Sequence, residues 1–396
     1  MRKTDLSVLK NKEKRLVIGL MSGTSADGID AALTEISGFG TSIKVKQLDF
    51  LFEPFDPAVR ESILRLAKGS YGGSAEICKM SSLLGKLYAD ACLKLCRQAG
   101  ISKEQVDLVG NHGQTVWHMP VKENYLGTEL TGTLQIGEDA FIAEALECPV
   151  IGDFRVRDMA AGGLGAPLVP YTEYLLYRKT DKTVALQNIG GIGNVTILPK
   201  NGTLEQVIAF DTGPGNMVMD ALAEKLTKGQ QTYDRGGRLA ASGNVNSGLL
   251  SFLMQDPYLS KMPPKTTGRE YYGEEYVKRL LQYGEREKVS LTDCLTSATR
   301  FTAESIAQGI RRFSPEKPEV LIVGGGGSKN PVLLQYIQEC LPECRVMTNE
   351  EIGYDSDSKE AVAFAVLANE ALGSMANNVP GVTGARHPVV MGKISL

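Results

Sequence analysis

Hydrophobic positions fall into short apolar runs near the N-terminus and into helical spacing beyond them. The runs at 16–21, 29–36 and 43–52 predict a meander of three strands, and the glycine-rich segment 22–28 predicts a turn between the first two. Later segments predict helices at 57–68, 74–98 and 138–147, and strands at 106–110 and around Val150. The polar residues 111–115 are expected at the end of a strand, where α/β sheets often bind ligands.

The second half of the chain repeats this beginning. Strands are predicted at 183–189, 195–198 and 207–210, with a glycine-rich turn at 190–194 between the first two. The other expected elements are helices at 217–226, 292–313 and 360–372, a strand at 320–323, another helix after the glycines of 324–328, loops with one helix over 233–272, and an irregular tail. The repetition predicts an α/β protein of two lobes, 1–160 and 161–396, with a hinge near 160–168. Whether the last helix returns to the first lobe is left open.

Charge and composition make several classes of function improbable. The chain has 396 residues, 42% of them hydrophobic and 22% charged, which is typical of a globular protein. Lys and Arg total 43 against 46 Asp and Glu, a net charge of −3 without a basic block. Neither nucleic acid nor a membrane surface is therefore expected as a partner. Homodimer formation is left open.

The cysteines and the N-terminal segment predict a cytoplasmic protein. Residues 1–15 are mostly polar, and no apolar run approaches the roughly 20 residues that span a bilayer. The seven cysteines are an odd number, and the closest pairs are separated by three residues rather than the two typical of zinc sites. Reduced thiols are expected, as in a reducing compartment.

Three glycine-rich turns, 22–28, 190–194 and 324–328, carry the strongest functional signal. Glycine lets main-chain N–H groups approach a phosphate because no Cβ blocks the ligand. Any one such turn alone is more simply interpreted as a tight hairpin. The P-loop pattern is absent, and the first turn leads into a strand rather than the helix of a dinucleotide-binding fingerprint. The repeated turns favour an actin-like nucleotide clamp that transfers a phosphoryl group.

Each role in phosphoryl transfer has a candidate residue. Thr24 and Ser25 are suited to phosphate oxygens, and Asp27 or Asp30 to a metal ion. Asp211, expected at a strand end before a helix that starts near Asn216, is the candidate base. A single Asp at such a position is more often a turn or cap residue. The glycines of 324–328 would leave bare backbone for adenine or ribose.

The acceptor is expected to meet polar residues of the first half. These are His112, Gln114, Thr115, Asp153, Arg155 and Arg157. Arginine suits an acceptor with a carboxylate because its fork makes bidentate bonds. An ion pair of Arg157 with Asp158 or another carboxylate is an equally good interpretation. A metal site at His112 and His118 is disfavoured because no third ligand is spaced nearby.

Several motifs resemble those of the anhydro-N-acetylmuramic acid kinases, and the resemblance covers nearly the whole chain. They lie at 21–30, 111–115, 152–155, 161–168, 188–191, 210–216, 267–269 and 382–385. Ala26 stands where Leu is usual in the family, and Leu164 where Gln is common. The second departure puts a polar contact near the hinge in doubt, not the reaction.

The resemblance implies a two-lobed actin-like, ribonuclease H-like fold with duplicated mixed sheets and a cleft between the lobes. It implies an enzyme that uses ATP and Mg²⁺ to open the 1,6-anhydro ring of an amino sugar with water and to phosphorylate O6, in cell-wall recycling. Asp211 matches the catalytic Asp, and Asp27 with Asp211 are the expected metal ligands. Cofactor binding is expected at Gly23, Thr24, Ser25, Ala26, Asp27, Gly28, Ile29, Asp30, Gly190, Gly191, Gly213, Gly215, Asn216, Gly324, Gly325, Gly326 and Gly327.

Two other functions stay open at this stage. A kinase of an ordinary hexose or polyol would keep the fold and change the acceptor. An ATPase switched by a protein partner would share the fold without phosphorylating a sugar.

Overall fold

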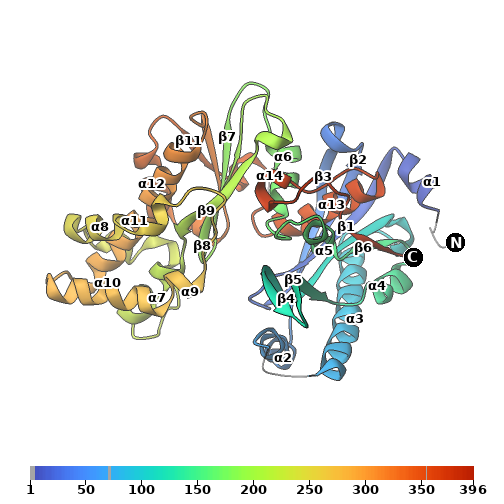
Figure 1. Ribbon diagram of the computed structural model, residues 1–396, viewed down its shortest axis with the longest axis horizontal. Coiled ribbons are helices and arrows are strands. Elements are labelled where there is room, and N and C mark those ends of the chain that lie inside the picture. Colours follow the sequence, from blue (N-terminus) through green and yellow to red (C-terminus); the bar gives the residue numbers. More distant parts are fainter. Residues whose placement is uncertain (1–4, 70–72, 354) are drawn as a thin grey trace. The chain divides into compact units, whose positions relative to one another are not determined.

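The computed structural model describes residues 5–69, 73–353 and 355–396. The chain divides into two compact units (Figure 1). The first comprises Met1–Leu176 and Asp357–Leu396, and the second comprises Tyr177–Ser356. Each unit encloses a hydrophobic core of its own.

The first unit is built on a mixed sheet. Its strands are β1 (Lys14–Ser22), β2 (Gly28–Ser37), β3 (Lys44–Pro54), β4 (Leu108–Tyr125), β5 (Thr128–Ile136), β6 (Val150–Gly152) and β12 (Lys393–Ser395). They lie in the order β12-β6-β4-β1-β2-β3, with β5 paired to β4. The first three strands are antiparallel neighbours, whereas β4 and β6 run parallel to β1. Its helices are α1 (Leu6–Asn11), α2 (Pro57–Ala67), α3 (Ser74–Gln98), α4 (Asp139–Leu146), α5 (Phe154–Ala160), α6 (Val169–Tyr177), α13 (Lys359–Leu372) and α14 (Pro380–Thr383).

Helix α13 packs directly on the backbone of this sheet. Gly19 of β1 and Gly110 of β4 are paired neighbours. A Cβ on Gly19 would lie 1.8 Å from the carbonyl oxygen of Ala361, and a Cβ on Gly110 would lie 2.1 Å from that of Phe364. The two glycines therefore allow the helix an approach that no larger residue permits.

The second unit repeats the arrangement of the first. Its strands are β7 (Val184–Ile189), β8 (Ile192–Leu198), β9 (Ile208–Pro214), β10 (Val320–Gly324) and β11 (Arg345–Thr348), in the order β11-β10-β7-β8-β9. Again the first three strands are antiparallel neighbours and the last two run parallel to the first. Its helices are α7 (Met217–Leu226), α8 (Ser247–Met254), α9 (Arg269–Tyr272), α10 (Glu274–Arg286), α11 (Leu291–Phe313) and α12 (Pro331–Cys340). The predicted α/β fold with duplicated mixed sheets is confirmed.

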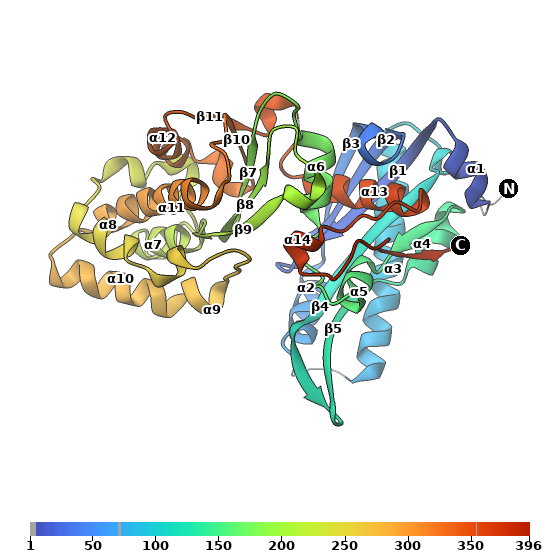
Figure 2. The ribbon, with the colours of Figure 1, turned by 45° about the horizontal axis from the view of Figure 1, so that its top comes forward.

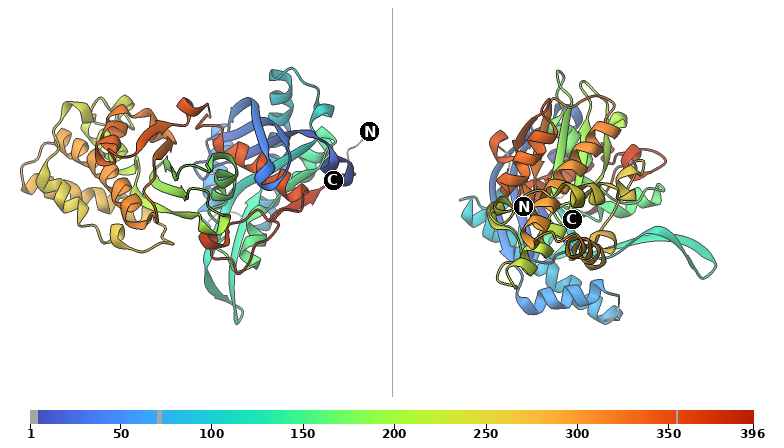
Figure 3. Two further views of the ribbon diagram at one scale, coloured as in Figure 1. Left: turned by 90° about the horizontal axis from the view of Figure 1, so that it is seen from above. Right: turned by 90° about the vertical axis from the view of Figure 1, so that its left-hand side faces the viewer.

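A long hairpin extends the first sheet beyond what the hydrophobic pattern predicted. Strand β4 was expected to end at Gly110, but it continues to Tyr125 and turns at Leu126 and Gly127 into β5. Both turn residues have left-handed φ angles, +52° and +84°, as a two-residue hairpin turn requires. Figures 2 and 3 show the hairpin standing away from the rest of its unit. The polar residues 111–115 therefore lie within a strand and not at its end.

The division into units differs from the predicted one. The units meet in sequence after Leu176, and the residues from Asp357 onward belong to the first unit because α13 packs on β1, β2 and β4. Segment 160–168, where the hinge was expected, is tied into the first unit. Leu164 donates its N–H to the carbonyl of Thr383 (2.8 Å).

Three further predictions need correction. Asp211 lies inside β9, not at a strand end, because β9 continues to Pro214 along β8. The tail is not wholly irregular, since it contains α14 and the strand β12, which pairs with β6. Helices α5, α6 and α10 and strand β11 were not predicted. Within the described ranges, no helix has the length and apolar character needed to cross a bilayer.

Candidate active site

The turn between β1 and β2 is held to β4 by buried side chains. Ser22 Oγ lies 2.6 Å from the side-chain oxygen of Gln114 and 2.9 Å from the carbonyl oxygen of Gly28, and these two acceptors share its single hydroxyl proton. The amide of Gln114 in turn donates to the carbonyl of Gly23 (3.1 Å). Gln114, predicted to meet the acceptor, therefore fixes the position of the turn.

The tip of this turn is exposed. Thr24, Ser25 and Asp27 present their side chains to solvent, while Ala26 between them is buried with φ +51°. The Asp27 carboxylate lies 3.5 Å from the guanidinium of Arg60, and both side chains are about half exposed. These residues form a polar rim. Ile29, also predicted to bind cofactor, places its side chain in the hydrophobic core.

His112 and Arg155 contact each other in the first unit. The Nε and one terminal nitrogen of Arg155 lie 3.1 and 2.9 Å from Nε2 of His112, and its other terminal nitrogen donates to the carbonyl of Gly165 (2.8 Å). Nε2 of His112 therefore accepts, and Nδ1–H donates to the carbonyl of Gly113 (2.7 Å). Burial and the charge of Arg155 lower the pKa of His112 to about 3, so the ring is neutral at neutral pH. The pair ties β4 to α5.

Arg157 is the exposed cation of this region. An ion pair with Asp158 was one interpretation of Arg157. The Asp158 carboxylate has other partners. Asp158 is buried and accepts from the side chains of Asn378 (2.7 Å) and Thr383 (2.8 Å). The contact of Arg157 with an anionic group of the acceptor stays a prediction.

Two other predicted acceptor residues have partners within the unit. Asp153, at the start of α5 with φ +51°, forms an ion pair with Lys393 (2.5 Å). The Thr115 hydroxyl accepts from the side-chain amide of Gln135 (3.1 Å).

Asp211 is fixed by the backbone of the second unit. One of its carboxylate oxygens accepts the N–H of Thr267 (2.8 Å), and its own N–H donates to the carbonyl of Lys265 (3.1 Å). The other carboxylate oxygen receives no hydrogen bond from the described residues. Burial raises the pKa of Asp211 to about 6, against the lowering effects of Thr267 and Lys265. The carboxylate is thus oriented, with one oxygen available and a pKa suited to accepting a proton.

Lys265, which sequence reasoning missed, anchors the segment that holds Asp211. Its ammonium lies 3.4 and 3.3 Å from the carbonyl oxygens of Tyr258 and Leu259, and 4.7 and 5.0 Å from the ring centres of Tyr258 and Phe313. Burial lowers its pKa to about 8. In the sequence, the only local feature that marks Lys265 is its position directly after two prolines.

The turn after β7 is hydrogen-bonded to the residues that precede α7. Gly215 and Asn216 donate their N–H groups to the carbonyls of Gly191 (2.9 Å) and Gly190 (2.7 Å). A Cβ on Gly215 would lie 2.2 Å from the carbonyl oxygen of Gly190. Glycine is needed here for the two segments to meet. Gly213 precedes them with φ +143°.

The glycines after β10 lie against the same turn. A Cβ on Gly325 would lie 2.6 Å from the side-chain oxygen of Asn188, and a Cβ on Gly327 would lie 2.3 Å from the side chain of Ile189. Gly324 is similarly close to Asn349 (2.4 Å). Gly326 differs, because it is exposed and its nearest neighbour would be 3.4 Å away. The predicted glycines of the second unit are therefore grouped around one turn, as a glycine surface of which Gly191 and Gly326 are exposed and the other glycines are wholly or partly buried.

This chain matches known proteins over nearly its whole length. The family model described as "Anhydro-N-acetylmuramic acid kinase" matches residues 15–396. The chain belongs to the anhydro-N-acetylmuramic acid kinase family. It is 50% identical over 388 residues to the anhydro-N-acetylmuramic acid kinase of Caldanaerobacter subterraneus subsp. tengcongensis, covering 98% of each chain. It is 45% identical to that of Bacillus cereus, covering 96% of this chain and 98% of the relative.

Solved structures of other proteins are more distant. The crystal structure of component A of the Acidaminococcus fermentans (R)-2-hydroxyglutaryl-CoA dehydratase is 11% identical, with a TM-score of 0.46, and covers 90% of this chain and 99% of its own. A likeness at this level carries no argument about the site.

In this member of the kinase family, a depression of about 260 Å³ adjoins three of the predicted residues, Thr24, Gln114 and Thr115. Its other lining residues are Ile63, Leu64, Ala67, Val116, Trp117 and His118. Sequence reasoning missed Trp117 and gave His118 no role. Trp117 is an exposed tryptophan close to the predicted acceptor residues. Its exposure could be recognised only from the structure, in which β4 continues past Gly110.

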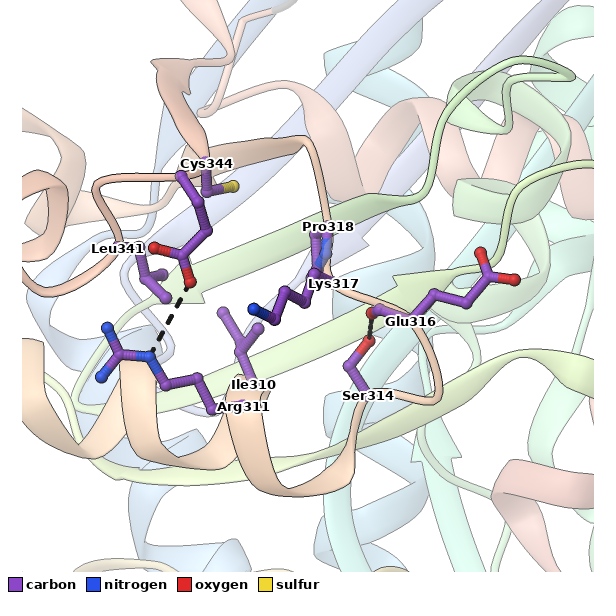
Figure 4. A pocket seen from close by; sticks show the side chains of 9 residues that line it. Ile310, Arg311, Ser314, Glu316, Lys317, Pro318, Leu341 and Cys344 are labelled. Carbon is purple, nitrogen blue, oxygen red and sulfur yellow. Dashed lines mark hydrogen bonds and ion pairs between the residues drawn. The ribbon is translucent and has the colours of Figure 1, made fainter.

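The crevice in Figure 4 lies elsewhere, near the end of α11. It is lined by Ile310, Arg311, Ser314, Glu316, Lys317, Pro318, Leu341, Glu343 and Cys344, none of them a predicted site residue. Its volume of about 30 Å³ is close to that of one water molecule, which is too small for a nucleotide or a sugar. Among the residues that the structure describes, no group of three or more His, Cys, Asp and Glu side chains is placed to hold a metal ion.

Proposed function

We propose that this chain is a cytoplasmic ATP-dependent kinase that opens the 1,6-anhydro ring of 1,6-anhydro-N-acetylmuramic acid and phosphorylates O6, giving N-acetylmuramic acid 6-phosphate. The match to the kinase family over residues 15–396 carries the proposal. Membership of a kinase family implies the use of ATP, and the family name implies an amino sugar as acceptor. The oriented carboxylate of Asp211 supports the chemistry.

Asp211 would act as the general base. Its available oxygen takes a proton from the water that attacks C1 of the sugar. The new bond from water oxygen to C1 forms as the C1–O6 bond breaks, and O6 attacks the γ-phosphorus as the bond to ADP breaks. Holding the reactants in line supplies much of the rate, since effective molarities of about 10⁵ M or more are available to well-oriented groups.

The remaining predicted groups would bind ATP and the acceptor. The polar rim at Thr24 and Ser25 offers hydroxyls to phosphate oxygens, and the open glycine surface at Gly326 offers bare backbone to adenosine. Arg157 offers a fork to the acceptor's carboxylate.

We expect magnesium to accompany ATP, and carboxylates of the predicted site are suited to it. Asp27 and Asp211 are the candidate ligands, and carboxylate oxygens are the ligands that Mg²⁺ prefers. When bound, the ion neutralises charge on the phosphates. We expect EDTA to reduce sugar phosphorylation to background and excess Mg²⁺ to restore it, as measured by coupled ADP release. Full activity in EDTA would contradict the requirement for a metal.

Activity is expected to fall as the pH drops below about 6. Protonation of Asp211, whose pKa is raised to about 6, removes the base, so kcat/KM should decrease about tenfold per pH unit on the acid side. Asp220 provides the matched control. Burial and Asp234 raise its pKa also to about 6, yet it is assigned no role in the reaction. The decrease in kcat/KM at acid pH should persist in Asp220→Asn. Its loss in this variant would show that Asp220, and not Asp211, is the group that titrates.

The product itself tests the proposed function. The purified chain is incubated with ATP, Mg²⁺ and 1,6-anhydro-N-acetylmuramic acid in ¹⁸O-labelled water, and the product is examined by mass spectrometry. Addition of phosphate and one labelled oxygen at C1 is expected. Phosphorylation of an ordinary hexose without label, or ATP hydrolysis that no sugar stimulates, would overturn the proposal.

A further inference from the structure

Strand β9 is the outer strand of its sheet, so the peptide groups on its outer edge need partners from outside the sheet. At Asp211, segment 258–267 supplies them. The N–H of Asp211 donates to the carbonyl of Lys265 (3.1 Å), and the carbonyl of Asp211 accepts from the hydroxyl of Tyr258 (3.0 Å). The N–H of Thr267 donates to the carboxylate itself (2.8 Å). One segment therefore fixes both the backbone and the carboxylate of Asp211.

The ammonium of Lys265 joins the two ends of this segment. It donates to the carbonyls of Tyr258 (3.4 Å) and Leu259 (3.3 Å). It also lies 4.7, 5.5 and 5.0 Å from the ring centres of Tyr258, Phe210 and Phe313. Lys265 is 6% exposed and Tyr258 is 1% exposed. The ammonium thus closes residues 258–265 into a buried loop, and both ends of this loop contact Asp211.

Keeping a cation in this loop costs free energy. In the part of the chain that the structure describes, its direct partners are carbonyl oxygens and rings, without a carboxylate in ion-pair contact. Burial and the charges of Arg312 and Lys261 lower the pKa of Lys265 to about 8, although Asp211 and Asp256 act in the opposite direction. The side chain is still charged at neutral pH. A methionine would fill the same space among the rings without that cost, so stability alone does not account for a lysine here.

The charge of Lys265 also acts on the carboxylate of Asp211. Burial raises the pKa of Asp211, the N–H of Thr267 and the charge of Lys265 lower it, and the charge of Glu270 raises it. A general base must be ionised to accept a proton. The buried cation therefore favours the form of Asp211 that can react.

We propose that Lys265 is a positioning residue for the general base. Its ammonium holds segment 258–267 against the outer edge of β9, which orients the Asp211 carboxylate, and its charge keeps that carboxylate ionised. The inference rests on the proposed function and adds to it the group that orients the base.

Lys265→Met tests the effect of the charge without any need for turnover. The titration of Asp211 is followed by carboxyl-carbon NMR of protein labelled with ¹³C-aspartate, and Asp211→Asn identifies its signal. The midpoint should move up by about one pH unit in Lys265→Met. It should not move in Lys261→Met, which removes an exposed ammonium 5.5 Å from the ring centre of Tyr258. An unchanged midpoint in Lys265→Met would overturn the inference. Failure of this variant to fold would also overturn it, because the lysine would then serve stability.

Turnover separates this inference from the proposed function. In Lys265→Met, kcat should fall about 10- to 100-fold with little change in the KM for ATP. The decrease in kcat/KM at acid pH should begin about one unit higher. Tyr258→Phe removes the hydroxyl that contacts Asp211 but keeps the cation, so it should lower kcat without moving that pH. Wild-type kcat in Lys265→Met would overturn the inference. If the wild-type chain forms no sugar phosphate while the Asp211 midpoint still moves in Lys265→Met, the proposed function fails and the action of Lys265 on the carboxylate stands.

Discussion

Replacement of Asp211 with asparagine is expected to abolish sugar phosphorylation while leaving ATP binding intact. Asparagine keeps the shape of the side chain and an oxygen that can accept the N–H of Thr267, but it cannot take a proton from water. The loss in kcat should be about 10³-fold or more. Product formation is measured with 1,6-anhydro-N-acetylmuramic acid, and ATP affinity by calorimetry.

Two controls make the Asp211 result specific. Asp220→Asn removes another partly buried carboxylate of the second unit whose pKa is raised, and it should retain turnover. The melting temperature of Asp211→Asn should stay near that of the wild type because the hydrogen bond to Thr267 is kept. Normal sugar phosphate formation by Asp211→Asn would show that another group serves as the base.

Replacement of Gly326 with valine is expected to weaken ATP binding about tenfold or more, or roughly 1.4 kcal/mol. Among the glycines after β10, Gly326 is exposed and its added Cβ would meet nothing closer than 3.4 Å. The protein should therefore fold normally, and the new side chain should occupy the space proposed for adenosine. Calorimetric titration with ATP measures the effect.

Gly132 on β5 is the matched control for this substitution. It also has open space, with its nearest neighbour 3.7 Å from an added Cβ, and it lies on the hairpin outside the glycine surface. Gly132→Val should bind ATP as the wild type does. If Gly326→Val folds and binds ATP with unchanged affinity, the glycines after β10 do not form the adenosine site.

Partners distant in sequence account for the contacts that sequence reasoning did not predict at the candidate site. His112 and Arg155 were grouped as acceptor residues because they lie near strand ends. In the structure they bond to each other, and Gln114 holds a turn that begins about ninety positions earlier. Arg157 was left between two interpretations, and the side chains that Asp158 contacts, Asn378 and Thr383, lie more than 200 positions away in sequence.

The sequence by itself determined the repeated strands, the glycine turns, the order of the motifs and therefore the family. These features depend on local periodicity and on residue types that act wherever they stand, such as glycine at a close approach. Only the tertiary structure decided that α13 closes the first unit, that β4 continues into a hairpin, and that Trp117, His118 and α2 form a depression. Each of these depends on side chains far apart in sequence, which no local pattern brings together.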